Sequence, residues 1–196
     1  MHISDGIISA PVCIAAHLVA LGAVVVAGRN STPDEIPKMG ITGAALFVAS
    51  LLHLPVAGTS LHPGLFGIAG VILGRRSFPV IYTALLFQSL AFQHGGLLTL
   101  GVNSINMAAG AYAAWAVWSI KGLPVSVRAL VAGFAGVMLP ALLMVVSFRV
   151  SGYPAQVGYL LVAYLVAASA EAVLTLFMVS FFLKVKPSVL AGGPEH

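Results

Sequence analysis

The predicted fold depends on one stretch of the chain, Pro55-Val56-Ala57-Gly58-Thr59-Ser60-Leu61-His62-Pro63. Its prolines and its glycine interrupt a long series of apolar residues, and its imidazole stands beside the proline that begins the next apolar segment. That segment, residues 63–73, has only 11 residues, and Arg75 and Arg76 follow it closely. The depth of this short segment therefore decides the depth of the stretch before it.

The composition is that of an integral membrane protein. Of the 196 residues, 60% are hydrophobic and 7% are charged, and the mean hydropathy is +1.05. Soluble domains carry about 25% charged residues. The net charge of +4 is therefore interpreted through membrane topology, and nucleic-acid binding is not predicted. A single cysteine, Cys13, excludes an internal disulfide and a thiolate metal cluster.

Seven apolar segments predict an all-α membrane protein, a bundle of seven transmembrane helices. They cover residues 11–27, 39–54, 63–73, 78–93, 105–120, 127–147 and 157–183. An odd number of spans puts the two termini on opposite sides of the membrane. With the amino terminus outside, eight of the nine lysines and arginines lie on the inner side, and only Arg149 lies outside. This positive-inside bias predicts an N-out, C-in topology.

Two connections are predicted to dip into the membrane from its outer face. If Arg75 marks the inner surface, the 13 residues back to His62 rise by about 20 Å as a helix, whereas the hydrocarbon core is about 30 Å thick. The connection 55–63 therefore lies below the outer surface, and the same is expected of the loop 94–103. Irregular backbone at this depth must be enclosed by protein or line a cavity, so a binding site is expected there.

The amino terminus offers an unusual metal chelate. In the opening stretch Met1-His2-Ile3-Ser4-Asp5-Gly6, the Met1 amine, the His2 amide nitrogen and the His2 imidazole can close two fused rings around one ion. Three nitrogens in one plane suit the tetragonal geometry that Ni(II) and Cu(II) prefer, and Co(II) can also adopt it. The alternative is that His2 is an ordinary polar residue near a frayed terminus.

His62 is the predicted fourth nitrogen donor, because it lies in a submerged loop on the same side of the membrane as the amino terminus. A histidine that is hydrogen-bonded within the bundle is the alternative interpretation. Five further residues are candidates for the surroundings of the site: Asp5, His53, Ser60, Asn103 and Asn106.

Each of these five has a predicted role from its position. Asp5 lies about one turn from His2 and is expected to orient its imidazole or to cap the first helix. His53 comes just before the submerged stretch, and Ser60 lies within it. Asn103 and Asn106 stand where the second loop re-enters the membrane, and they are expected to brace that loop by satisfying its amides and carbonyls.

Other polar residues within the apolar segments are weaker candidates. His17 is expected to be hydrogen-bonded between helices, and His196 lies in the tail. His94 is interpreted as a polar loop residue in preference to one that helps a metal ion reach the site. Glu171 is the only acid well inside a span, and such residues are costly and often functional. It is interpreted as a structural hydrogen-bonding residue or as part of a coupling surface, in preference to a metal ligand.

Several motifs carry a resemblance to a known family. They are Met-His-Ile-x-Asp-Gly at residues 1–6, Pro-Val-Ala-Gly-Thr-Ser-Leu-His at 55–62, and Gly-Gly-Leu-Leu-Thr-Leu-Gly-Val-Asn-Ser-Ile-Asn-Met at 95–107. With residues 169–175 and 186–190, they resemble the CbiM/NikM family across nearly the whole chain. The members of that family are the substrate-capture components of energy-coupling-factor importers for cobalt or nickel.

The resemblance implies a seven-helix bundle whose amino terminus folds into an outward-facing pocket. It implies that Ni(II) or Co(II), the transported substrate, is held by the Met1 amine, the amide and imidazole nitrogens of His2, and the His62 imidazole. The implied partners are a transmembrane coupling subunit, cytoplasmic ATPase subunits and a small accessory membrane subunit. The chain departs from the family pattern at Tyr164, usually a histidine, and at His94, more often an acid.

The sequence thus predicts a single integral membrane substrate-capture domain, residues 1–196, in a bacterial or archaeal cytoplasmic membrane. Residues 1–10 form its metal-binding segment, and residues 184–196 form a cytoplasmic tail. The predicted function is to capture nickel or cobalt from outside for an ATP-driven importer. A stand-alone secondary transporter or channel for metal ions is the alternative. An enzyme is not predicted, because the chain has no P-loop, no paired acids and no His-x-x-x-His motif.

Overall fold

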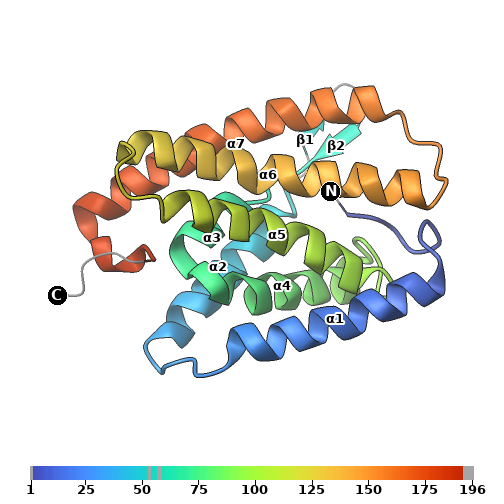
Figure 1. The fold of residues 1–196 in the computed structure, drawn as a ribbon, viewed down its shortest axis with the longest axis horizontal. Coiled ribbons are helices and arrows are strands. Elements are labelled where there is room, and N and C mark those ends of the chain that lie inside the picture. Colours follow the sequence, from blue (N-terminus) through green and yellow to red (C-terminus); the bar gives the residue numbers. More distant parts are fainter. Residues whose placement is uncertain (1, 53, 57–58, 192–196) are drawn as a thin grey trace.

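The computed structural model describes residues 2–52, 54–56 and 59–191, and in these ranges the chain forms seven α-helices and one hairpin of two short strands (Figure 1). The helices are α1 (Ala10–Gly28), α2 (Glu35–Ala49), α3 (Phe66–Leu73), α4 (Ser77–Phe92), α5 (Leu100–Trp118), α6 (Val125–Val150) and α7 (Val157–Val185). Strands β1 (Leu54–Val56) and β2 (Thr59–Leu61) pair antiparallel. Two 3-10 turns, η1 (Gly74–Arg76) and η2 (Pro187–Val189), complete the elements.

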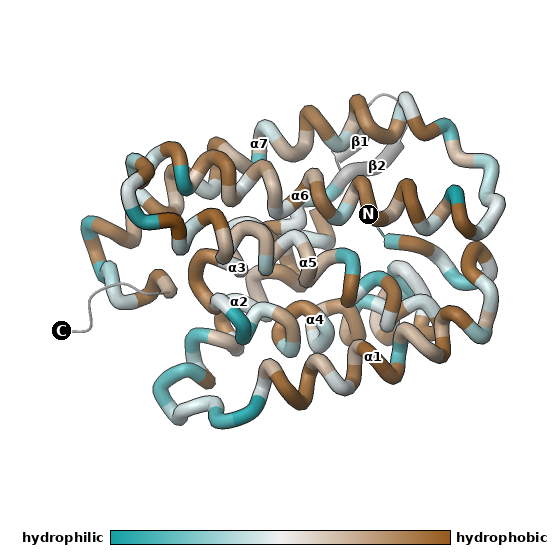
Figure 2. Tube along the Cα trace, viewed as in Figure 1, coloured by the Kyte–Doolittle hydropathy of each residue, from teal (hydrophilic) through white to brown (hydrophobic). Residues whose placement is uncertain are grey.

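Four stretches of helix in the described residues are long and apolar enough to cross a membrane: α1, the run Phe66–Phe92 through α3 and α4, α6 and α7. Figure 2 shows apolar residues along the lengths of the helices and hydrophilic residues mainly at their ends and in the connections. Only 17% of the apolar window of α1 is buried inside the protein, so most of this helix presents apolar side chains outward. Such a surface is stable against lipid, and the chain is a multi-pass membrane protein.

Each predicted apolar segment coincides with one helix, but several boundaries differ. The connection 55–63 was expected to be irregular, yet it contains the hairpin in which Leu54 pairs with Leu61 and Val56 with Thr59. This pairing satisfies backbone groups that an irregular loop would leave to other partners. Helix α5 begins at Leu100, five residues earlier than predicted, so Asn103 belongs to the helix and not to the loop.

The C-terminal end also differs from the predicted tail. Helix α7 continues to Val185, and the chain then turns back against the bundle. Leu190 is buried, and the Ala191 amide donates a hydrogen bond to the Val71 carbonyl at 2.8 Å. The indole of Trp118 donates to the Ala191 carbonyl at 3.1 Å. Residues 187–191 are therefore part of the packed structure at this end.

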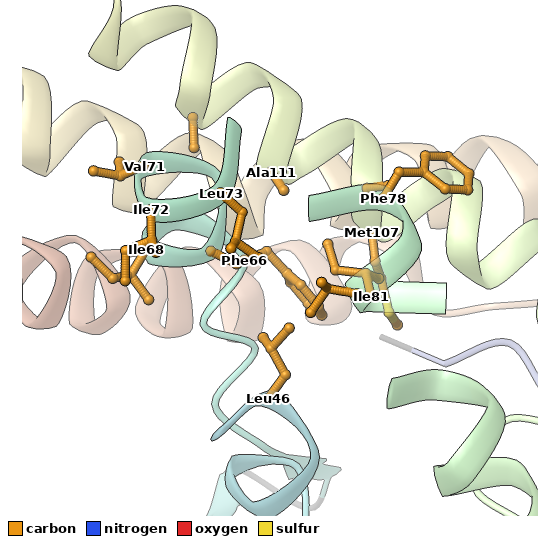
Figure 3. Close-up of a cluster of buried hydrophobic side chains, with 14 of the residues drawn as sticks. Leu46, Phe66, Ile68, Val71, Ile72, Leu73, Phe78, Ile81, Met107 and Ala111 are labelled. Carbon is orange, nitrogen blue, oxygen red and sulfur yellow. The ribbon is translucent and has the colours of Figure 1, made fainter. Parts of the chain in front are cut away.

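Helix α3 is the centre of the packing, because all eight of its residues are buried. It lies close to α5 and α6 through glycines: a Cβ atom at Gly67 would lie 2.6 Å from the Cα of Gly133, and one at Gly70 would overlap the Ala111 backbone. Such contacts let helix backbones approach one another in a membrane. Figure 3 shows that Leu46, from α2, points toward Phe66 at the start of α3.

One buried arginine joins three elements at the end of the bundle that is predicted to face inward. Arg76 donates hydrogen bonds to the Ala27, Arg29 and Asn30 carbonyls at the end of α1, at 2.6–2.7 Å. It also forms an ion pair with Glu35, at the start of α2, at 3.0 Å. Hydrogen bonds from the Arg76 guanidinium and from the Thr32 amide to the Glu35 carboxylate hold the pKa of Glu35 below its usual range. The carbonyls that α1 leaves without a helical partner are thereby satisfied.

Candidate metal site

The amino-terminal segment is anchored to α5. Residues 2–9 turn back from the start of α1 into the bundle (Figure 1). Ile3 has no exposed surface, and its amide donates to the Asn103 Oδ1 atom at 2.8 Å. The Ile3 carbonyl accepts hydrogen bonds from Asn103 Nδ2 at 2.9 Å and from the Thr99 hydroxyl at 2.8 Å. Asn103, predicted to brace its own loop, instead holds this segment, so His2 has a defined place.

Asp5 also anchors the amino-terminal segment to the start of α5. Its Oδ1 atom accepts hydrogen bonds from the Thr99 amide and hydroxyl, both at 2.9 Å, and Oδ2 accepts one from the Leu98 amide at 3.3 Å. Burial raises the pKa of Asp5, but these hydrogen bonds outweigh it and hold the pKa below its usual value. Asp5 therefore caps α5, and both predicted roles, orienting His2 and capping the first helix, were wrong.

Two glycines allow the loop after α4 to pack against this segment. A Cβ atom at Gly96 would overlap the Asp5 carboxylate, and one at Gly95 would lie 3.2 Å from the Cδ2 atom of His2. Both residues have positive φ, +92° at Gly95 and +136° at Gly96, which side chains disfavour. The loop can thus reach His2 and Asp5 only with glycine at both positions.

The structure brings the imidazoles of His2 and His62 together through one nitrogen of each ring. Their nearest nitrogens, His2 Nδ1 and His62 Nε2, lie 3.2 Å apart. The other nitrogen of His2, Nε2, lies 3.0 Å from Gln88 Oε1, and the other nitrogen of His62, Nδ1, lies 3.3 Å from the Pro63 carbonyl. Carbonyl oxygens only accept hydrogen bonds, so these two outer nitrogens carry the hydrogens. The two facing nitrogens then present lone pairs to one another, and a cation between them satisfies both.

The separation of the facing nitrogens fits one bound ion. Imidazole nitrogens lie about 2.0–2.1 Å from a divalent transition metal such as zinc. Two such nitrogens 3.2 Å apart subtend roughly 100° at the ion, which is close to neighbouring corners of a square plane. The facing atoms therefore have the geometry of two adjacent ligands before any ion is added.

A small cavity lies directly beside these nitrogens. His2, His62 and Gln88 line part of it, together with Ser50, Pro63 and Gly64, and apolar side chains of α2, α3 and α4 line the rest: Leu46, Phe66, Ile81, Ala84 and Leu85. Its volume of about 10 Å³ is near the lower limit for a single water molecule. The space suits one small ion.

The lowered pKa of the His2 imidazole favours metal binding. Burial, followed by the positive charges of the amino terminus and of the neighbouring His62 and His94, lowers the pKa of His2 well below its usual value. Metal ions bind the neutral imidazole, so protons compete with the ion only under more acidic conditions than usual.

A third imidazole, His94, belongs to the same cluster. The potential ligand atoms of His2, His62 and His94 all lie within 4.8 Å of one another. The interpretation of His94 as a polar loop residue does not account for this position, and the sequence predicts no role for Gln88. The available signals were a histidine directly before a double glycine and a glutamine inside an apolar segment.

Glu171 holds the backbone next to His62. Its Oε1 atom accepts hydrogen bonds from the Gly64 amide at 2.6 Å and from the Leu65 amide at 3.0 Å, at the start of α3. Helix amino termini carry unpaired N–H groups, and a carboxylate satisfies them well. The prediction of a structural hydrogen-bonding residue is confirmed.

The remaining predicted residues lie outside this cluster or cannot be placed in it. Met1, His53 and His196 lie outside the described residues. Ser60 is in β2, where it pairs with Pro55. Asn106 is buried in α5, and its Nδ2 atom has no hydrogen-bond partner among the described residues. His17 bonds the Tyr82 hydroxyl at 3.2 Å between α1 and α4, as predicted for a residue bonded between helices.

Comparison with known proteins gives one consistent result. The sequence model of CbiM, described as a cobalt uptake substrate-specific transmembrane region, matches residues 2–189. A putative metal transport protein of Haemophilus influenzae is 38% identical over 108 residues, 55% of this chain and 52% of the relative. A putative fused cobalt transport protein, CbiMQ, of Methanocorpusculum labreanum is 31% identical over 96% of this chain and 36% of its own length.

A fused nickel transport protein, NikMN, of Rhodobacter capsulatus is 30% identical over 97% of this chain and 64% of its own length. The chain thus spans between about a third and two thirds of the length of these three relatives. The crystal structure of a transition metal transporter superposes with a TM-score of 0.83, at 24% identity, over 94% of this chain and 93% of that one. The fold of the bundle is therefore shared with that transporter.

Proposed function

This chain belongs to the CbiM family of cobalt-uptake transmembrane proteins, and from that premise we propose that it captures Ni(II) or Co(II) for an ATP-driven energy-coupling-factor importer. The observation that carries the proposal is the 3.2 Å separation between His2 Nδ1 and His62 Nε2. The chemistry is binding and release of an ion, without bond cleavage in a substrate.

The proposed ligands are the Met1 amine, the His2 amide nitrogen, His2 Nδ1 and His62 Nε2. Two fused chelate rings put the Met1 amine opposite His2 Nδ1, so His62 occupies the corner opposite the amide nitrogen. His62 Nε2 and His2 Nδ1 are then neighbours in the plane, in agreement with their observed separation. Four nitrogens in a plane suit Ni(II) and tolerate Co(II). Met1 as the mature amino terminus, with a free amine, is part of this proposal.

We place the site near the outer face of a seven-span bundle with its amino terminus outside and its carboxyl terminus inside. The whole chain acts as one capture domain, with residues 1–10 as the metal-binding segment and the C-terminal residues on the cytoplasmic side. Support comes from the positive-inside bias and from Arg76, which joins α1, α2 and η1 at the other end of the bundle. His62, which follows the hairpin, and Gly95, in the loop after α4, both lie against His2 at the proposed outer end.

The proposed partners are a transmembrane coupling subunit, cytoplasmic ATPase subunits and a small accessory membrane subunit. Two relatives are named as fused transport proteins, CbiMQ and NikMN, which supports the idea that chains of this kind act with further subunits. A stand-alone transporter driven by protons has less support. Glu171, the acid well inside a predicted span, is already engaged through its Oε1 atom with the Gly64 and Leu65 amides at the start of α3, which supports a structural role.

Binding displaces protons in this proposal. The His2 amide must lose its proton for its nitrogen to bind the ion, whereas the facing imidazole nitrogens bind through lone pairs. Gln88 and the Pro63 carbonyl keep the outer nitrogens protonated throughout, so the lone pairs stay directed at the ion. Release to the inside requires that the partners move the loops apart and that the amide regains its proton.

A single added residue tests the proposal. Extending the chain by one glycine before Met1 moves the histidine to the third position, where the terminus can form a four-nitrogen site without His62. In the native protein, His62→Ala is expected to abolish high-affinity binding. In the extended protein, binding is expected to be independent of His62, and uptake with the partner subunits is expected to fail. His17→Asn is the matched control, a histidine substitution outside the site.

The measurements are titration calorimetry with Ni(II) and Co(II) and uptake in proteoliposomes with the partner subunits. If the native and extended proteins bind and transport alike, with the same dependence on His62, the terminal chelate is wrong.

A further inference from the structure

His94 lies against both imidazoles of the proposed chelate. Its ring centre is 4.2 Å from that of His2, and the two rings are nearly perpendicular, at 88°. Its ring centre is 5.4 Å from that of His62, at an angle of 76°. The rings of His2 and His62 are 5.0 Å apart and tilted by 38°. The His94 ring is thus roughly perpendicular to the His2 and His62 rings, whereas those two rings are tilted from one another by a smaller angle.

These separations fit three imidazoles around a single ion. A nitrogen bound at about 2.1 Å keeps its ring centre roughly 3.2 Å from the metal. When the two metal–nitrogen bonds meet at a right angle, the ring centres lie about 4.5 Å apart. A wider angle at the metal gives a larger separation between the ring centres. The three observed separations, 4.2, 5.0 and 5.4 Å, allow one point at this distance from all three ring centres.

The orientation of His94 suits a position above the plane. In the proposed chelate the His2 ring is fused to the plane of nitrogens, so it lies nearly within that plane. An imidazole that binds from above has its ring along the perpendicular axis. The 88° angle between His94 and His2 is the angle this arrangement requires.

The loop that carries His94 is built onto the site. The His94 amide donates to the Gln88 carbonyl at 3.3 Å, and the side chain of the same glutamine holds His2 Nε2. The next two residues, Gly95 and Gly96, pack against His2 and Asp5. The position of His94 relative to His2 therefore depends on contacts on both sides of it.

We propose that His94 is a fifth ligand above the four-nitrogen plane and that it raises the affinity for Co(II) relative to Ni(II). This inference rests on the proposed function. A strictly planar set of four nitrogens is the geometry that Ni(II) favours, whereas Co(II) gains from further donors. A fifth nitrogen also makes the Ni(II) complex paramagnetic, because planar low-spin Ni(II) has no unpaired electrons and five-coordinate Ni(II) of this kind does.

The test compares wild type, His94→Ala and a neighbouring control, Gln93→Asn, in the full chain with its native terminus. Gln93 is exposed, and asparagine tolerates its positive φ of +53°. With NiCl₂ and CoCl₂ as the probes, His94→Ala is expected to lower the Co(II) affinity about 10- to 100-fold and the Ni(II) affinity much less. Its Ni(II) complex is expected to be diamagnetic, while the wild-type and Gln93→Asn complexes are paramagnetic.

X-ray absorption on the wild-type complex counts the donors around the bound ion, so it tests the inference even if His94→Ala does not fold. Five nitrogen donors around Co(II) support the inference, and four overturn it. Equal metal affinities and equal magnetism in wild type and His94→Ala overturn it as well, and leave the chelate of His2 and His62 intact. If wild type binds neither metal, the proposed function itself fails, which is a different result.

Discussion

His62 Nε2 lies 3.2 Å from His2 Nδ1, although 60 residues separate the two histidines in the chain. Each histidine is positioned by further contacts of its own. His2 is held through Gln88 and through the pairing of Ile3 with Asn103, and His62 is followed by a turn that Glu171 caps. The distance between the two nitrogens therefore depends on α4, α5 and α7 together, and each of these supports can be tested separately.

Gln88→Leu is expected to weaken Ni(II) binding about 10- to 100-fold, the usual cost of removing a partner behind a ligating histidine. The leucine cannot accept the Nε2 hydrogen of His2, so the ring loses its fixed tautomer and orientation. Gln88→Glu is the matched variant, since a carboxylate oxygen accepts the same hydrogen bond. Titration calorimetry checks both. Equal losses in the two variants would show that the hydrogen bond is not what matters.

Gly96→Ala is expected to undock the amino-terminal segment, because its Cβ atom would overlap the Asp5 carboxylate. Gly122→Ala is the control: Gly122 also has positive φ, +102°, but nothing lies within 4 Å of its Cβ position. Both variants have backbone strain, and only the first has the clash. We expect faster hydrogen exchange at the Ile3 amide and weaker metal binding in Gly96→Ala alone. Similar behaviour in both would assign the effect to backbone strain.

Glu171→Leu is expected to destabilise the protein by about 1–3 kcal/mol for each of the Gly64 and Leu65 amides that it leaves buried and unpaired. His62 precedes this turn by two residues, so metal affinity is expected to fall as well. Glu171→Gln retains an accepting oxygen and is expected to stay close to wild type. Thermal unfolding in detergent measures the stability of both. A glutamine variant as weak as the leucine variant would indicate that the charge, and not the hydrogen bonds, is required.

The contribution of Asp5 to docking is expected to depend on pH. Its pKa in the folded protein is below the usual 3.8, so the stabilisation is fully present above the usual pKa and is lost as the pH falls through the lowered one. Exchange of the Ile3 amide in wild type and in Asp5→Asn is the measurement. The difference between them is expected to be constant above about pH 5 and to shrink below about pH 4. Because His2 is present in both, its own titration cancels in the comparison. A difference that persists unchanged to pH 2 would contradict this.

The helices were predictable because hydropathy acts over long, contiguous segments. Each apolar segment became one helix, and the short segment before Arg75 became α3, the buried centre of the bundle. The errors occurred where polar residues are satisfied by distant partners. The sequence predicts Asn103 in a loop, but it lies within α5, where the backbone of Ile3 satisfies its side-chain amide. The hairpin at 54–61 was missed because its pairing shows no clear alternation in the sequence.

The sequence by itself determined the class of protein, the positions of the helices and the two imidazoles of the proposed chelate, because composition, hydropathy and ligand chemistry are local properties. Only the tertiary structure decided which polar groups meet. In the structure Gln88 is hydrogen-bonded to the outer nitrogen of His2, Asp5 caps the start of α5, and His94 lies beside His2 and His62. The physical reason is that hydrogen bonds and metal ligands act over about 3 Å, whereas these residues are up to about a hundred positions apart, and only the packing of the helices brings them that close.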